Sequence, residues 1–257
     1  MIIALIAKGV KEMSLLMSFI LGVIIGSFLN VCIYRIPKGE SVARGRSHCT
    51  NCGKTLGATE LIPVISYLFL RGKCKSCKVR ISPRYALVEL LCGCIFTLAY
   101  AAFGVSARGI ITALFFAVLI VVSFIDLDTM EIPNGAHIII IALSVASVLL
   151  VPEISILDRL IGLVCVSVPF LLISLFTGGF GGGDIKLLAV SGLLLGWKGV
   201  LTGALIAIVV GACVGVAYKL ITHKRKMPFG PFLSLGLAAG AIIGEPLITW
   251  YIGLIIR

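Results

Sequence analysis

Long apolar stretches constrain this chain more than any other feature of its sequence. A helix of about 20 apolar residues crosses the roughly 30 Å hydrocarbon layer of a bilayer. The sequence therefore predicts an all-α, polytopic membrane protein with about eight transmembrane helices. The sixth stretch is short, which suits a tilted half-span or a helix packed inside the bundle. The candidate spans are residues 13–34, 86–104, 108–126, 134–152, 158–178, 185–197, 199–220 and 229–252.

Composition excludes a water-soluble fold. Hydrophobic residues make up 60% of the 257 residues and charged residues 13%, whereas soluble domains are about 45–50% apolar and about 25% charged. A soluble particle of this size would leave too much apolar surface in water. A net charge of +11 would suggest nucleic acid in a soluble protein, but the basic residues gather in loops. We therefore expect membrane lipids as partners and no nucleic acid.

The positions of Lys and Arg predict the orientation of the chain. Residues 35–85 hold 11 of the 22 basic residues. In the eight-span arrangement Lys186 and the four basic residues of 219–226 fall on the same side, which leaves six on the other. The positive-inside rule then places residues 35–85 in the cytoplasm and the N-terminus outside. The six on the other side are Lys8, Lys11, Arg108, Arg159, Lys198 and Arg257.

This orientation implies three regions. Residues 1–34 form an N-terminal segment with the first span, 35–85 a small cytoplasmic loop domain, and 86–257 a transmembrane bundle. Removing the short sixth span would place the two basic regions on opposite faces, so that span is retained.

The cytoplasmic loop contains two Cys-x-x-Cys pairs, Cys49 with Cys52 and Cys74 with Cys77, separated by 21 residues. Four thiolates at this spacing can close a tetrahedral Zn²⁺ site, which would be structural because no position is left for water. Such a metal would stabilise a loop that is too small to fold by apolar burial. Disulfides are the alternative, disfavoured in the cytoplasm, and His48 could replace one ligand.

Two acidic groups flank predicted spans on the cytoplasmic side. Asp126 and Asp128 end the third span, and Asp184 begins the sixth after a run of glycines. Two carboxylates in one site do not both ionise easily and hold one proton between them. The ionised acid can then activate a water while the protonated one hydrogen-bonds the scissile carbonyl. The alternative is that these acids only cap helix ends. Gly181 and Gly183 would let a peptide backbone approach.

Several motifs, in order, resemble the type IV prepilin peptidase family, the leader peptidases and N-methyltransferases of the GxGD aspartyl protease class. The resemblance covers nearly the whole chain. A lone GxGD motif would be weak, but the ordered set is specific. The motifs are Gly26 to Pro37, the two cysteine pairs, Ser82 to Tyr85 with Glu89, Gly181 to Lys186, and Pro228 to Pro231.

The resemblance implies that Asp126 and Asp184 are the catalytic pair. Asp126 fits better than Asp128 because it lies seven residues before Pro133, as the family's first acid does. Asp128 is then a supporting acid. Lys186 would pair with a lipid headgroup or a carboxylate, or simply reach the interface as a surface lysine.

The implied substrates are prepilins or pseudopilins of type IV pilus, type II secretion or competence machinery. The enzyme would lie in the bacterial cytoplasmic membrane, with its active site and zinc loop facing the cytoplasm. The family also methylates the new N-terminus with S-adenosylmethionine. No G-x-G-x-x-G motif is present, so this site must be built otherwise. The motif positions make Gly26, Asn30, Glu60 and Glu89 candidates.

Four alternatives remain at this stage. One is a protease-only member that lacks methylation, and a second is another intramembrane aspartyl protease such as the preflagellin type, which would not be expected to carry the four cysteines. A third is a transporter or channel with the aspartates as proton relays, which predicts acids near mid-membrane. The fourth is a scaffold whose zinc loop binds partner proteins.

Overall fold

The computed structural model describes residues 2–222 and 227–255, and the regular elements within these ranges are helices. The chain forms two compact units, Met1–Val105 and Ser106–Arg257. The division predicted from the sequence, into 1–34, 35–85 and 86–257, stays a prediction. The orientation prediction also counts Lys224, Arg225, Lys226 and Arg257, which lie outside the described residues.

The first unit is built on a pair of long helices, α1 and α3. Glycines at their contact let the two backbones approach closely, as in membrane helix pairs generally. A Cβ atom on Gly22 would lie 2.6 Å from the carbonyl oxygen of Cys92, and one on Gly93 would lie 2.7 Å from Val23. The elements of this unit are α1 (Ile2–Arg35), η1 (Ile36–Lys38), η2 (Ala58–Glu60), α2 (Ile65–Phe69) and α3 (Arg84–Phe103).

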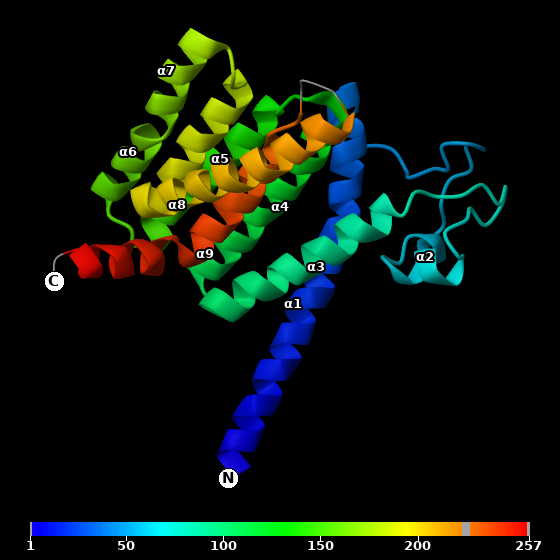
Figure 1. Cartoon of the computed structure of the whole chain (residues 1–257). Coiled ribbons are helices and arrows are strands. Elements are labelled where there is room, and N and C mark those ends of the chain that lie inside the picture. The colour runs from blue at the N-terminus through cyan, green and yellow to red at the C-terminus, as the bar shows by residue number, and fades with distance from the viewer. Residues whose placement is uncertain (1, 223–226, 256–257) are drawn as a thin grey trace. The chain divides into compact units, whose positions relative to one another are not determined.

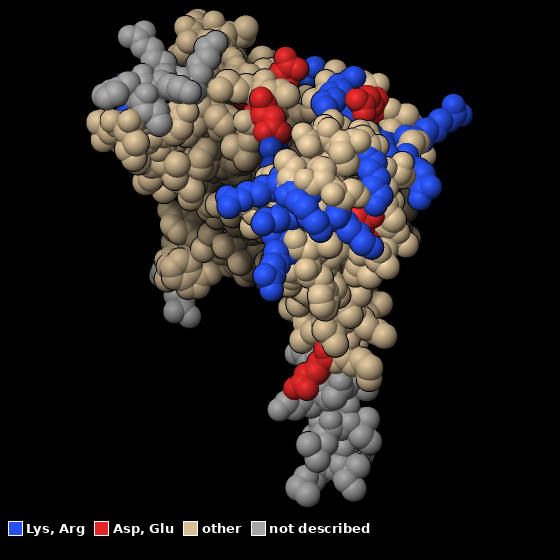
Figure 2. Space-filling view, turned by 90° about the vertical axis from the view of Figure 1, so that its right-hand side faces the viewer, with Lys and Arg blue, Asp and Glu red and all other residues tan. Residues whose placement is uncertain are grey.

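A polar segment, residues 36–83, joins α1 to α3 in this unit. Arg35, the last residue of α1, is buried and fixes the start of this segment. Its guanidinium donates hydrogen bonds to the carbonyls of Ser41 at 2.9 Å and Arg44 at 2.6 Å. Figure 2 shows Lys and Arg side chains gathered on the face of the unit that bears this segment. Such a face favours contact with anionic lipid headgroups.

The second unit is a helical bundle around α4. This helix is buried over most of its length, whereas in the other long helices fewer than half of the residues in the most apolar stretch are buried. Exposed apolar side chains on helices with satisfied backbones are what a bilayer requires. The elements are α4 (Ala107–Thr129), α5 (Asn134–Leu150), α6 (Ile156–Cys165), α7 (Ser167–Thr177), α8 (Gly182–Thr222) and α9 (Gly230–Ile255).

Helix α8 is broken at Gly196, which has φ 73° and ψ 173°. This backbone conformation is essentially restricted to glycine. The chain reverses at this break. The Phe229 ring lies 5.7 Å from the ring of Phe180, just before α8, and also 3.0 Å from the position of a Cβ on Gly211, in the second part of α8. The two parts of α8 therefore run back along each other. An unbroken helix from Gly182 to Gly211 would span about 44 Å. Figure 1 shows the bend in α8, from yellow to orange.

The predicted fold class is confirmed. Within the described residues six helices are long and apolar enough to cross a membrane, and α5 is a shorter apolar helix. The predicted sixth and seventh spans are the two parts of α8 on either side of Gly196. The short first part packs closely on α6, where Gly162 and Gly192 leave no room for a Cβ atom. The predicted span 158–178 is α6 and α7, which meet at Val166.

A buried arginine satisfies the backbone carbonyls that the break leaves open. A helix end leaves carbonyls without partners, and Arg159 of α6, only 1% exposed, supplies donors to them. Its Nη1 donates to the carbonyls of Leu193 at 3.3 Å and Leu194 at 3.0 Å. Its Nη2 donates to the carbonyls of Ser147 and Val151 at the end of α5, both at 3.2 Å. Arg159 therefore joins α5, α6 and the break in α8.

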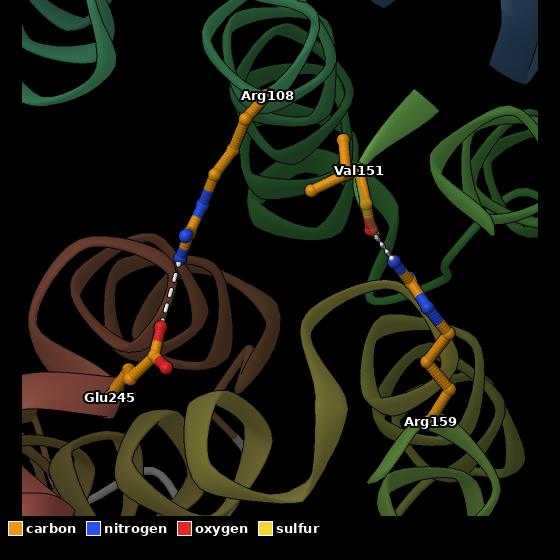
Figure 3. Close-up of polar contacts among 4 residues, drawn as sticks. All are labelled: Arg108, Val151, Arg159 and Glu245. Carbon is orange, nitrogen blue, oxygen red and sulfur yellow. Dashed lines mark hydrogen bonds and ion pairs between the residues drawn. The ribbon is translucent and has the colours of Figure 1, made fainter. Parts of the chain in front are cut away.

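We predict that Arg159→Met lowers the stability of the protein by at least about 3 kcal/mol, because several buried carbonyls lose their donor at once. Arg108→Met is the matched control. Arg108 forms a partly exposed ion pair with Glu245 at 3.5 Å, and such pairs contribute at most about 1 kcal/mol. Figure 3 shows both arginines. Thermal unfolding in detergent measures the difference, and equal effects of the two substitutions would contradict the role given to Arg159.

Candidate active site

Asp126 lies in the last turn of α4 and is 5% exposed. Its Oδ2 accepts a hydrogen bond of 2.7 Å from the backbone N–H of Gly230, the first residue of α9. A helix N-terminus carries unpaired N–H groups and a partial positive charge, so it is a favourable partner for a carboxylate. Gly230 has no side chain to obstruct the contact, because a Cβ there would lie 2.7 Å from the same oxygen. The start of α9 thus fixes this carboxylate.

Asp184 lies in the first turn of α8 and is partly exposed. Its Oδ2 accepts a hydrogen bond of 3.2 Å from the backbone N–H of Gly181. A Cβ on Gly181 would lie 3.1 Å from that oxygen, so the glycine lets the loop fold over the acid. The second carboxylate is therefore also held at a helix N-terminus, by the main-chain N–H of Gly181 in the glycine-rich loop.

The two carboxylates lie near enough for their charges to interact. Aromatic contacts join the segments that hold them. Phe180, next to Gly181, has its ring 5.7 Å from that of Phe229, next to Gly230. The end of α4, the start of α8 and the start of α9 thus meet at one site, although their residues are far apart in the sequence.

The loop before Asp184 is also fixed from α5. His137, which is buried on α5, has its Nε2 3.1 Å from the carbonyl oxygen of Gly183. A Cβ on Gly183 would lie 3.1 Å from the Cβ of Ile132. The space that Gly183 leaves is thus occupied by the chain itself, and the histidine determines the direction of this carbonyl.

Asp128 and Lys186, the other charged residues singled out near the site, are exposed. Asp128 is exposed, whereas Asp126 is buried. Residues two apart on a helix lie on different faces, so only one of these two acids can face the bundle. Lys186 is exposed, and its charge acts on the His137 ring.

In the first unit the four cysteines of the polar segment come together. Their sulfur atoms all lie within 4.8 Å of one another, and the sulfurs of Cys49 and Cys77 are 3.9 Å apart. Sulfurs at 2.3 Å from one Zn²⁺ would be about 3.8 Å apart. Each pair lies on a tight turn closed by a residue at positive φ, Gly53 in the first and Lys78 in the second. The cluster has the geometry of a four-sulfur metal site.

Main-chain groups of these turns prepare the sulfurs for a cation. The N–H of Val79 lowers the pKa of the Cys77 thiol to about 6, and that of Cys52 lowers the pKa of the Cys49 thiol. The N–H of Lys54 acts in the same direction on Cys52, but desolvation and the neighbouring sulfurs outweigh it and raise the pKa of that thiol to about 11. Thiolates crowded in this way are stabilised by a bound metal cation.

A cavity of about 430 Å³ lies beside the cysteine cluster within the first unit. Glu60 and Glu89 both line it, together with Asn30, Cys49 and Cys74. Glu89 is 8% exposed, and its Oε2 accepts a hydrogen bond of 2.7 Å from the N–H of Val64. The structure therefore brings two of the acids singled out from the sequence to one cavity.

Two family models match the chain, and the matched regions fall in the two compact units. Residues 20–103 match the bacterial peptidase A24 N-terminal domain, and residues 113–216 match the type IV leader peptidase family. A protein of Bacillus subtilis is 37% identical over 238 residues, which are 91% of this chain and 96% of the relative. This chain belongs to the type IV leader peptidase family.

Other members of the family are similar over the same length. A protein of Aeromonas hydrophila is 33% identical and covers 96% of this chain and 97% of its own. One of Burkholderia pseudomallei is also 33% identical, over 91% of this chain and 87% of its own. All three relatives are named prepilin leader peptidase/N-methyltransferase. No solved structure matches the chain at a significant level.

The contacts of two residues at the candidate site were not predicted from the sequence, although Gly230 lies within the Pro228 to Pro231 motif. Gly230 acts through its backbone N–H, which any residue except proline has, so its sequence carries little signal of the contact with Asp126. His137 is one of only three histidines and follows the Pro133-Asn134 turn closely. Its rarity and its position four residues after Pro133 could have drawn attention to it.

Proposed function

We propose that Asp126 and Asp184 are the catalytic pair of a peptidase that removes the leader of a prepilin. The observation that supports this best is that both carboxylates, from opposite parts of the second unit, are held by main-chain N–H groups within range of each other's charge. Two such acids share a proton and so supply a base and an acid at once. The name of the relatives, prepilin leader peptidase/N-methyltransferase, supports the same reaction.

In this mechanism the pair acts on a water molecule between them. The ionised carboxylate accepts a proton from the water, which attacks the scissile carbonyl, while the protonated carboxyl donates a hydrogen bond to the carbonyl oxygen. The N–H of Gly230 and that of Gly181 keep the two carboxylates oriented throughout. Orientation of this kind lowers the barrier because little has to move during the reaction.

The substrate we infer is a prepilin or pseudopilin of a type IV pilus, type II secretion or competence system. Its apolar helix would lie in the bilayer beside the enzyme, with the leader in the cytoplasm. Asp128 and Glu131 are exposed near the active acid and would attract a basic leader. We place the enzyme in the bacterial cytoplasmic membrane, with the site and the cysteine cluster on the cytoplasmic face.

The second proposed activity is methylation of the new N-terminus with S-adenosylmethionine as the methyl donor. When bound, this donor would supply a methyl group from its cationic sulfur to the neutral α-amino nitrogen, which would lose a proton to water, and it would leave as the neutral sulfide. The relatives are named for both a leader peptidase and an N-methyltransferase, which supports this activity over a protease-only or transporter function.

We further propose that the metal at the four cysteines is a structural Zn²⁺. Four thiolates leave no coordination position for a water, and the spacing of the sulfur atoms fits the Zn–S bond length. The polar segment 36–83 has few buried apolar side chains, so a metal would contribute much of its folding energy.

We predict that Asp126→Asn and Asp184→Asn each lower prepilin cleavage by at least about 1,000-fold, because in either variant only one carboxyl group remains and no proton can be shared between two. Asp128→Asn, two residues along α4 and exposed, should reduce cleavage by less than about tenfold. Processing of a prepilin in membranes measures all three, with membrane insertion checked for each. Normal cleavage by either of the first two variants would disprove the pair.

A second prediction concerns the support of Asp126. Gly230→Ala would push a Cβ to 2.7 Å from its carboxylate and should lower cleavage about 100-fold, since small displacements at a reacting group are costly. Gly215→Ala is the matched control, because a Cβ there would contact only the end of Met227 at 3.4 Å. Equal cleavage by the two variants would show that the contact with Gly230 is unimportant.

For the metal, we predict about one zinc ion per chain, with a sharp loss when Cys49 and Cys74 are both changed to serine. The pair Cys94→Ser and Cys213→Ser, which lies outside the cluster, should keep it. Elemental analysis of the purified proteins gives the metal content. Unchanged zinc in the first variant would exclude these cysteines as ligands.

A further inference from the structure

The cavity of the first unit has features of a built ligand site. It lies between the end of α1, the polar segment and the start of α3, and Asn30, Tyr67 and Glu89 each represent one of these elements on its wall. Its volume of about 430 Å³ falls in the range of small-molecule sites. Because all of its lining belongs to the first unit, the proposed peptidase pair contributes nothing to it.

Two acids line the cavity, Glu60 and Glu89. Residues 35–85 carry eleven basic and two acidic side chains, and Glu60, one of these two acids, lines the cavity. Glu89, the one acid of α3, lines it from the other side and is 8% exposed. A buried carboxylate is costly without a function or a partner. Glu60 is half-buried, and Arg35, Lys73 and Arg80 line the same cavity. The cavity therefore presents acidic and basic side chains together and suits a ligand that carries charges of both signs.

Glu89 also holds a strained backbone. Val64 has φ 60° and ψ −51°, an unfavourable conformation for a β-branched residue. Its N–H donates to Glu89 Oε2 at 2.7 Å, and the Ser27 hydroxyl hydrogen-bonds the same side chain. Such strain persists only where surrounding contacts fix it, and it concentrates at binding sites. The carboxylate is therefore positioned by contacts within the protein itself.

Aromatic side chains complete the wall. Tyr34, Tyr67 and Tyr85 all line the cavity, and they are three of the six tyrosines in the chain. Aromatic rings stack on flat ligand groups and attract cations to their faces. The ring of Tyr34 already has the Lys38 ammonium 3.4 Å from its centroid, so this ring accepts a cation. Aromatic faces beside acidic and basic side chains suit a ligand that has a planar ring system and charged groups of both signs.

We propose that this cavity is the methyl-donor site, with Glu60 and Glu89 facing the positive charges of S-adenosylmethionine and the tyrosines contacting its adenine. The inference rests on the proposed methylation activity and assigns it to these residues. The proposal also links the metal to donor binding. Cys49 and Cys74 line the same cavity, so the metal site forms part of its wall and loss of metal should also weaken donor binding.

The test is direct binding of radiolabelled S-adenosylmethionine to the full-length protein in detergent, by equilibrium dialysis. Glu89→Gln should raise the Kd at least about tenfold and Glu60→Gln about fivefold, in line with the loss of an interaction between charges. Glu245→Gln, which neutralises an exposed acid of the second unit, is the matched control and should not change it.

S-adenosylhomocysteine, which lacks the methyl group and the charge on sulfur, separates recognition from structure. If the acids recognise the charge, both variants should lose more affinity for the cationic donor than for the neutral product. Equal losses for the two ligands would overturn that role. Prepilin cleavage and thermal unfolding of the same samples show that the proteins are folded, and Tyr67→Phe, which keeps the ring, should retain donor binding.

The outcomes distinguish the inference from the function on which it rests. Donor binding that is present but unchanged in Glu60→Gln and Glu89→Gln disproves this site and leaves methylation standing. A wild-type protein that binds no donor disproves both the site and methylation, while cleavage by the same sample would preserve the peptidase. We expect the Cys49→Ser, Cys74→Ser variant to bind less donor. Unchanged binding would show that the metal site does not contribute to the cavity wall.

Discussion

The break in α8 at Gly196 is the constraint on which the second unit depends. It reverses the chain in the middle of a 41-residue helix, so the start of α8 and the start of α9 lie at the same end of the bundle. A straight helix would carry the chain about 44 Å away over the residues from Gly182 to Gly211. The reversal exposes carbonyls in an apolar bundle, and the Arg159 side chain satisfies them. A buried arginine remote from the carboxylates is thus a condition for the site.

The two carboxylates are held by the same kind of interaction. Each accepts a hydrogen bond from a main-chain N–H at a helix N-terminus, Asp126 from Gly230 and Asp184 from Gly181. Main-chain donors do not rotate as side chains do, and they belong to elements fixed by packing. This arrangement holds the two acidic side chains near each other. Glycine is required at both donors because a Cβ would crowd the acid.

Much of the protein was predictable because the bilayer and the metal impose regular patterns. Span length follows from bilayer thickness, which gave the helical fold, and the break at Gly196 matches the short sixth stretch. The cysteine spacing predicted a cluster, and the sulfurs do come together. The orientation of the chain stays a prediction. Arg159, counted there among the basic residues on the side away from the cytoplasm, is buried and donates hydrogen bonds to carbonyls.

The sequence by itself determined the membrane-type helical fold and singled out the candidate residues, because acids and cysteines are rare in an apolar chain and their spacing is regular. The tertiary structure alone decided which of Asp126 and Asp128 faces inward, and how His137 and Gly230 fix the site. It also decided that Glu60 and Glu89 meet in one cavity. Spacing along a chain reports local geometry, whereas contacts between distant segments and the hydrogen bonds of backbone groups depend on how the helices pack.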